Sequence, residues 1–232
     1  MSQEEARKME RLRFAIEHEI RGTITVAKGY AEFARKGKFG SLEPKVVQAF
    51  ESIERVADKV TIIATNLNEL IRFEYQSASI VKKSFNNLEF CKKALKNVSL
   101  EAKKRKISIE SSLTDDLKLS ADMKALELVL TNLLRNAIQF SPEGKQVILT
   151  LESTPKEHQI VVKDEGVGLS ASDREKLWTR PEEIRPEYGR QGACIGLHVC
   201  HIIIAHHGGS IEATSDGIGK GSKFLVRLPL SK

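Results

Sequence analysis

Three motifs in the second half of the chain carry groups that suit a phosphate-bearing ligand. Asn132 and Asn136 are four residues apart in an apolar segment, so a helix would place both on one face. Their side-chain oxygens are hard ligands of the kind that Mg²⁺ accepts. Asp164 ends a strand-like run and is followed by Gly166 and Gly168. Such glycines let the backbone pass close to a ligand, and the carboxylate can accept a hydrogen bond from an amino group.

The third motif runs from Gly192 to Gly196 and opens an apolar segment that reads as a helix. Backbone N–H groups at a helix N-terminus can hold phosphates. Each motif also has a purely structural interpretation, because asparagines cap helices and Asp-Gly strings form turns. The order of the three motifs along one chain favours the ligand-binding interpretation.

A fourth candidate, far upstream, is His18 with its neighbour Glu19. A carboxylate that accepts a hydrogen bond from Nδ1–H leaves Nε2 of an imidazole as a nucleophile. The same carboxylate can serve as a general base when the proton leaves. His18 is off the apolar seam that contains Ile16 and Ile20, so we expect it to face solvent. An idle surface histidine is the alternative.

The N-terminal part has the periodicity of two helices. Apolar or small residues recur every three or four positions over residues 9–34 and again over residues 46–71. Between them, two glycines and Pro44 mark a loop. A single hairpin would leave part of these seams in water, whereas two paired hairpins would bury them. We therefore predict an all-α hairpin at residues 1–78 that forms a four-helix bundle as a homodimer. A hairpin packed on its own C-terminal domain is the alternative.

The pattern changes after a short polar link at residues 76–79. Helical periodicity indicates helices at residues 84–102, 123–140 and 195–206. Alternating or β-branched runs indicate strands at residues 107–111, 117–119, 146–152, 159–163, 210–214 and 224–230. Helices placed between hairpin-like strands predict an α+β two-layer sandwich over residues 82–232.

Composition narrows the class of protein. With 232 residues, 41% apolar and 29% charged, the chain is typical of a soluble globular protein. No apolar run approaches the roughly 20 residues of a membrane span, so any membrane contact would come through an upstream segment. An odd number of cysteines favours a reducing compartment, and we expect a cytoplasmic location. The net charge of +6 suits a phosphate-bearing ligand or an acidic partner. A 6% aromatic content disfavours nucleic acid as the partner.

Together these motifs resemble the catalytic region of a dimeric sensor histidine kinase, whose second domain is a histidine kinase/Hsp90-like ATPase. His18 to Arg21 resemble the first four positions of the family motif His-Glu-Leu-Arg-Thr-Pro. The resemblance implies autophosphorylation on His18, assisted by Glu19, and phosphotransfer to an aspartate of a response-regulator receiver domain. Gly22 and Thr23 replace the family's Thr and Pro, which leaves phosphatase activity open.

The same resemblance implies that ATP and Mg²⁺ bind in the second domain. Asn136 matches the family's metal ligand, and Asp164 matches the aspartate that bonds the exocyclic amine of adenine. Arg135 is a candidate phosphate-facing cation, and the Phe140 ring is expected to pack on the nucleotide. The residues expected to contact the nucleotide are Asn132, Arg135, Asn136, Phe140, Asp164, Gly166, Gly168, Gly192, Gly196 and Leu197.

Three other hypotheses stay open. A degenerate kinase that binds nucleotide but transfers little phosphate is favoured by Cys194, which replaces a family glycine, and by a short lid at residues 179–191. A chaperone-like or mismatch-repair-like ATPase lacks a counterpart of the helix that carries His18. A zinc site is disfavoured because its ligands would point in several directions from one helix; these are Cys194, His198, Cys200, His201, His206 and His207.

Overall fold

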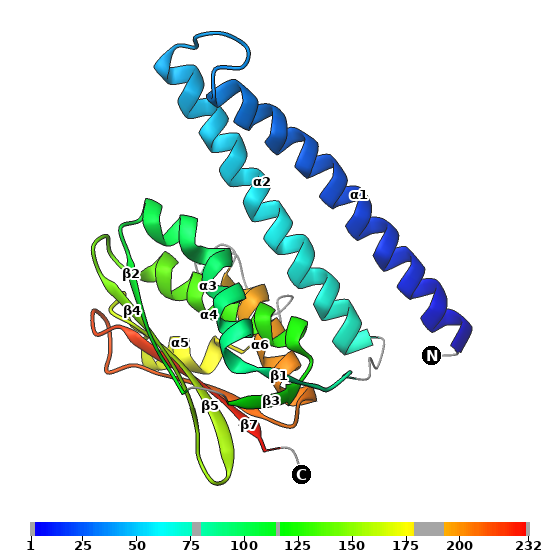
Figure 1. Ribbon diagram of the computed structural model, residues 1–232, viewed down its shortest axis with the longest axis vertical. Coiled ribbons are helices and arrows are strands. Elements are labelled where there is room, and N and C mark those ends of the chain that lie inside the picture. Colours follow the sequence, from blue (N-terminus) through cyan, green and yellow to red (C-terminus); the bar gives the residue numbers. More distant parts are fainter. Residues whose placement is uncertain (1–2, 76–79, 115–116, 179–192, 231–232) are drawn as a thin grey trace. The chain divides into compact units, whose positions relative to one another are not determined.

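The computed structural model describes residues 3–75, 80–114, 117–178 and 193–230. The chain divides into two compact units, Met1–Ala78 and Ser79–Lys232, each with its own architecture (Figure 1). No helix among the residues described combines the length and the apolar character that a membrane span requires.

The first unit is a hairpin of α1 (Gln3–Arg35) and α2 (Pro44–Leu70), followed by one turn of π-helix, η1 (Ile71–Tyr75). Pro44 opens α2, as expected for a residue without a backbone donor. Two ion pairs cross between the helices, Lys28 Nζ to Asp58 Oδ1 at 2.5 Å and Arg35 Nε to Glu54 Oε1 at 2.9 Å. Their order along the chain fits two antiparallel helices.

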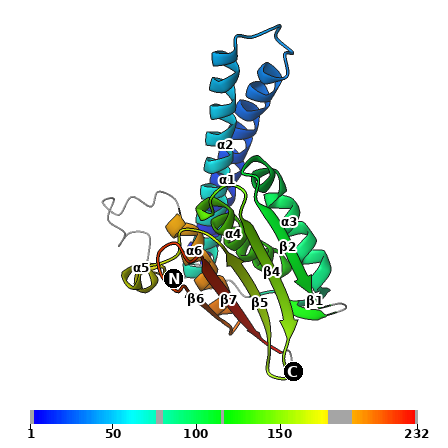
Figure 2. The same ribbon diagram turned by 90° about the vertical axis from the view of Figure 1, so that its left-hand side faces the viewer.

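The second unit is the predicted two-layer sandwich. Its main sheet has five strands in the order β2-β4-β5-β7-β6. The strands are β2 (Ser108–Leu113), β4 (Gln146–Ser153), β5 (Glu157–Asp164), β6 (Ser210–Thr214) and β7 (Ser222–Pro229). Buried and part-exposed residues alternate along β4 and β5, which fits a sheet with one covered face. The covering layer consists of α3 (Asn87–Lys104), α4 (Met123–Phe140) and α6 (Ala193–His206) (Figure 2).

Helix α4 lies at the centre of this layer and contacts both α3 and α6. Asp122 caps its N-terminus, where the carboxylate accepts a hydrogen bond from Ala125 N at 3.2 Å. The core of the unit includes fully buried side chains of α4, among them Leu126, Leu133 and Leu134. This core fixes the direction of the polar side chains that α4 also carries.

Four details differ from the sequence prediction. The helix expected from residue 84 begins at Asn87, because Asn86 caps it by accepting a hydrogen bond from Leu88 N at 2.7 Å. The residues before it form β1 (Lys83–Asn86), which pairs with β3 (Lys118–Ala121) in a separate two-stranded sheet. Strand β2 is parallel to β4 and not part of a hairpin. A short helix that was not expected, α5 (Ala171–Lys176), begins with a capping box at Ser170.

Candidate functional site

Asn132 joins α4 to the start of α6. Its side chain is 4% exposed, and Nδ2 donates a hydrogen bond to the Gly196 carbonyl at 3.4 Å. A Cβ built on Gly196 would lie 3.5 Å from Asn132 Cγ, so the glycine rests directly against the amide. In this structure Asn132 therefore holds the backbone of the Gly196 motif in place.

Asn136, one helical turn later, has an unsatisfied amide. Its Nδ2 atom is buried and has no hydrogen-bond partner among the described residues. A buried amide without a partner costs about 1–3 kcal/mol, so such atoms are uncommon in finished cores. The orphaned amide fits a site that a ligand completes, and the amide oxygen is of the type that Mg²⁺ accepts.

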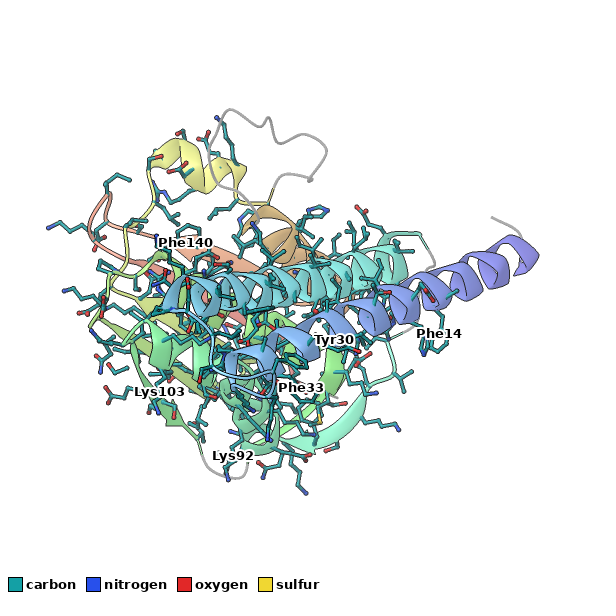
Figure 3. All side chains as sticks on the ribbon, turned by 90° about the horizontal axis from the view of Figure 1, so that it is seen from above. Phe14, Tyr30, Phe33, Lys92, Lys103 and Phe140 are labelled. Carbon is teal, nitrogen blue, oxygen red and sulfur yellow. The ribbon has the colours of Figure 1, made fainter. Side chains whose placement is uncertain are left out.

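Arg135 and Phe140 have other contacts in this structure. Arg135 Nε lies 3.3 Å from Glu101 Oε2, so the guanidinium must share or leave this ion pair to reach a phosphate. Phe140 is the last residue of α4 and is partly buried (Figure 3). Its carbonyl accepts a hydrogen bond from Val167 N at 3.1 Å, which ties the end of α4 to the loop after β5.

Asp164, the last residue of β5, is 4% exposed and firmly oriented. Its Oδ1 accepts hydrogen bonds from Gly166 N at 2.8 Å and from Ser222 N at 3.1 Å. The Ser222 hydroxyl donates to Oδ2. A carboxylate has about four lone-pair sites, so these three bonds leave acceptor capacity for an amino group of a ligand. The sequence motifs did not point to Ser222, which is the first residue of β7 and directly follows the glycine-rich turn.

Glycine is required at Gly166 and Gly168 because the neighbouring backbone leaves no room for a side chain. A Cβ on Gly166 would lie 2.6 Å from the Phe140 carbonyl oxygen. Gly168 has a φ of +70°, and its Cβ would lie 2.1 Å from the Gly217 carbonyl oxygen. The close approach expected at these positions is therefore present, but its partner in this structure is the protein backbone.

The start of α6 is only partly described. Gly192, the lid at residues 179–191 and the side chain of Cys194 lie outside the described residues. Leu197 is 4% exposed and belongs to the core, so only its backbone can face a ligand. Cys200 is buried, and this burial raises the pKa of its thiol to about 12. Its thiol therefore stays protonated.

Three histidines in α6 or directly after it contact neighbouring groups. His198 Nδ1 lies 3.3 Å from the Trp178 carbonyl, and the Trp178 ring lies 5.8 Å from the ring of His201. His207 Nδ1 lies 2.7 Å from the Ile203 carbonyl. Among the described residues, no group of three or more His, Cys, Asp or Glu side chains is arranged to hold a metal ion.

His18 lies on the exposed surface of α1, as expected. Its imidazole stacks on the Phe14 ring, with 6.4 Å between the ring centroids. Glu19 is also exposed, but no hydrogen bond joins it to His18, because adjacent helical residues face different directions. Arg21 instead pairs with Glu17 at 2.6 Å. Glu19 must rotate before it can assist the imidazole.

Comparison with known proteins finds a family model that matches most of the second unit. Residues 121–232 match the model described as histidine kinase-, DNA gyrase B-, and HSP90-like ATPase. The sandwich fold, the two asparagines of α4 and the Asp164 loop all lie in or next to the matched region.

The chain is also similar along most of its length to a sensor protein. It is 28% identical to sensor protein SrrB of Staphylococcus aureus, over 92% of this chain and 37% of that protein. The chain therefore spans little more than a third of the length of this curated relative. The match extends over parts of both units.

Solved structures have the same fold. Full-length ShkA in complex with AMPPNP matches 96% of this chain and 46% of its own, with a TM-score of 0.71 and 19% identity. Histidine kinase ThkA in complex with the response regulator protein TrrA matches 95% of this chain and 61% of its own, with a TM-score of 0.63 and 22% identity.

Proposed function

We propose that this chain is the cytoplasmic catalytic region of a two-component sensor kinase that binds ATP and phosphorylates itself on His18. One observation carries the proposal: an exposed imidazole on the α1–α2 hairpin belongs to the same chain as an ATPase domain with an oriented, buried Asp164. The homology to sensor kinases supports a role in two-component signalling.

The nucleotide would be held by groups of three elements. Asp164 would accept a hydrogen bond from the exocyclic amine of adenine through the free lone pair of Oδ2. Asn136 would supply its amide oxygen to Mg²⁺, which neutralises charge on the phosphates when it is bound. Asn132 would keep the Gly196 backbone against the phosphates, since it already bonds the Gly196 carbonyl.

In the transfer step, His18 Nε2 would attack the γ-phosphorus in line with the bridging oxygen. The new P–N bond forms as the P–O bond to the β-phosphate breaks, and ADP leaves. Glu19, after rotation, would hold Nδ1–H and stabilise the charged imidazole. The phosphoryl group would then pass to an aspartate of a response regulator. The structure of ThkA with a response regulator supports a partner of this class.

A homodimer is part of the proposal. The hairpin exposes large apolar side chains at helical spacing, which a monomer has no reason to leave in water. On α2 these are Val46, Ile53, Val56, Ile63 and Leu67, and on α1 they include Val26, Tyr30 and Phe33 (Figure 3). A second hairpin packed on these stripes would complete a four-helix bundle.

The test is incubation with γ-labelled ATP and Mg²⁺, followed by acid and base treatment of the labelled protein. We expect acid-labile, base-stable label on the parent and none on His18→Gln. His206→Gln, a matched change at another exposed histidine, should keep the label. Equal labelling of His18→Gln would refute His18 as the acceptor.

A degenerate kinase is the second candidate, and two observations favour it. Glu19 makes no bond to His18, and Arg135 is held by Glu101. In that case ATP would bind to the parent with measurable affinity, but no label would appear. This outcome would make the protein a nucleotide-binding scaffold.

A further inference from the structure

Two glycine-rich segments lie against each other at the Asp164 end of the sheet. One is the loop after β5, and the other is the turn between β6 and β7. Gly219 N donates to the Val167 carbonyl at 2.8 Å, and Gly221 N donates to the Gly166 carbonyl at 3.1 Å. The apolar side chains of Val167 and Ile218 in these segments are 49% and 67% exposed, so they add little packing between the segments.

Ser215, the residue after β6, joins these segments through its side chain. Its Oγ accepts hydrogen bonds from Leu169 N at 3.1 Å and from Gly217 N at 3.2 Å. It also donates to the Gly221 carbonyl at 2.6 Å. A hydroxyl has one donor and two acceptor lone pairs, so these three bonds fill the hydrogen-bonding capacity of the Ser215 side chain. Leu169 itself is only 8% exposed, so water reaches this site poorly.

The turn that Ser215 holds is the one that orients Asp164. A Cβ on Gly221 would lie 2.0 Å from the Asp164 carbonyl oxygen, so the two backbones are in direct contact. The next residue, Ser222, binds both oxygens of the Asp164 carboxylate. Ser215 makes no hydrogen bond to Asp164, and it acts on this carboxylate only through the turn.

We propose that Ser215 is a positioning residue for base recognition, which fixes the turn that aims the Asp164 carboxylate and so determines selectivity for adenine over guanine. This inference rests on the proposed ATP site. Guanine carries a carbonyl oxygen where adenine carries its exocyclic amine, and a fixed carboxylate repels that oxygen. Without the hydrogen bonds of Ser215, the turn would let the Asp164 carboxylate move away from the base. ATP would then lose the hydrogen bond from its adenine amine, and GTP would no longer be repelled at its guanine carbonyl oxygen.

The experiment measures Kd for ATP and for GTP, with Mg²⁺, by calorimetry on the full chain. The variants are Ser215→Ala, Ser215→Thr, which keeps the hydroxyl, and Ser210→Ala, a matched change at an exposed serine of β6. We expect Ser215→Ala to weaken ATP binding about tenfold, because three backbone groups lose their partner, while GTP binding changes less. The ratio of the two affinities should therefore fall. Ser215→Thr should restore it, and Ser210→Ala should keep the parental ratio.

A parental ATP-to-GTP ratio in Ser215→Ala would overturn the proposal, even if the variant melts at a lower temperature. Should Ser215→Ala not fold, the same ratio is measured on Ser215→Cys, whose thiol is a weak hydrogen-bonding group. A parental ratio in that variant overturns the proposal equally. A parent that binds neither nucleotide would instead refute the ATP site, and the inference with it.

Discussion

The hairpin Met1–Ala78 and the ATPase unit Ser79–Lys232 differ in where their apolar side chains lie. In the ATPase unit, the large apolar residues of α4 and of the central strands are almost completely buried, as Leu134 and Leu149 illustrate. In the hairpin, Val26, Ile53 and Val56 are 60%, 45% and 61% exposed. The ATPase unit therefore buries its apolar side chains within its own fold, whereas the hairpin leaves several of its own exposed.

This difference separates the roles of the two units. A sandwich with a closed core can hold its site residues in fixed positions, as the three bonds to Asp164 illustrate. A hairpin with exposed apolar stripes would be completed by the proposed second copy, and the position of its His18 would then depend on that copy. Changes in the ATPase unit should therefore act on stability, whereas changes in the hairpin should act on assembly.

The largest effect is expected in the core of α4. Leu134 is 0% exposed, and its truncation in Leu134→Ala should lower the free energy of unfolding of the ATPase unit by about 2–5 kcal/mol. Urea denaturation followed by circular dichroism measures this loss. Leu100→Ala is the control, because Leu100 is 64% exposed and should change stability by no more than about 0.5 kcal/mol. Equal losses in both variants would contradict a closed core around α4.

The second prediction concerns the exposed apolar stripe of α2 in the hairpin. Ile53→Glu adds a charge to the exposed stripe of α2 without lowering helix propensity. In a symmetric dimer the change occurs on both sides, so dimerisation should weaken by about 2 kcal/mol or more. Light scattering after size exclusion should show a monomer at concentrations where the parent is a dimer. Gln48→Glu, a charge at an exposed polar position of α2, should leave the dimer intact.

The sequence revealed those features of the fold that depend on local pattern. Periodic apolar residues predicted the two helices of the hairpin and α4. It did not reveal β1, because four residues next to a helix have too little periodicity of their own, and β1 exists only through its pairing with β3. The parallel pairing of β2 with β4 likewise depends on contacts between segments far apart in the chain, which local sequence patterns do not report.

In the candidate site, too, the sequence revealed residues with a local pattern and did not reveal residues that depend on tertiary contacts. Asn132, Asn136 and Asp164 were found because their types and spacing carry chemical meaning. Ser215 and Ser222 were missed, because a serine beside a glycine-rich turn has no distinctive pattern until the fold brings it to another segment. Likewise, the ion pair between Arg135 and Glu101 joins two helices and has no sequence signal.

The smallest effect concerns pH and belongs to the ATPase unit. His207 is 2% exposed, and its Nε2 accepts a hydrogen bond from the Asp122 backbone N–H at 3.1 Å, which requires a neutral ring. Burial is the main cause that lowers the pKa of His207 from its ordinary value. The unfolded chain therefore binds the proton more readily. Stability should be complete above about pH 6.5 and should decline as the pH falls below that value.

Melting of the parent at about pH 7.5 and about pH 5.5 measures this decline. His207→Gln should reduce it, because the glutamine oxygen can accept from Asp122 N–H and does not titrate. Part of the slope should remain, since burial also lowers the pKa of His158. His206→Gln, at the exposed neighbouring histidine, should keep the parental slope. An unchanged slope in His207→Gln would mean that the link between α6 and the cap of α4 does not control stability. The hairpin, whose one histidine is the exposed His18, should keep its helix content over this range.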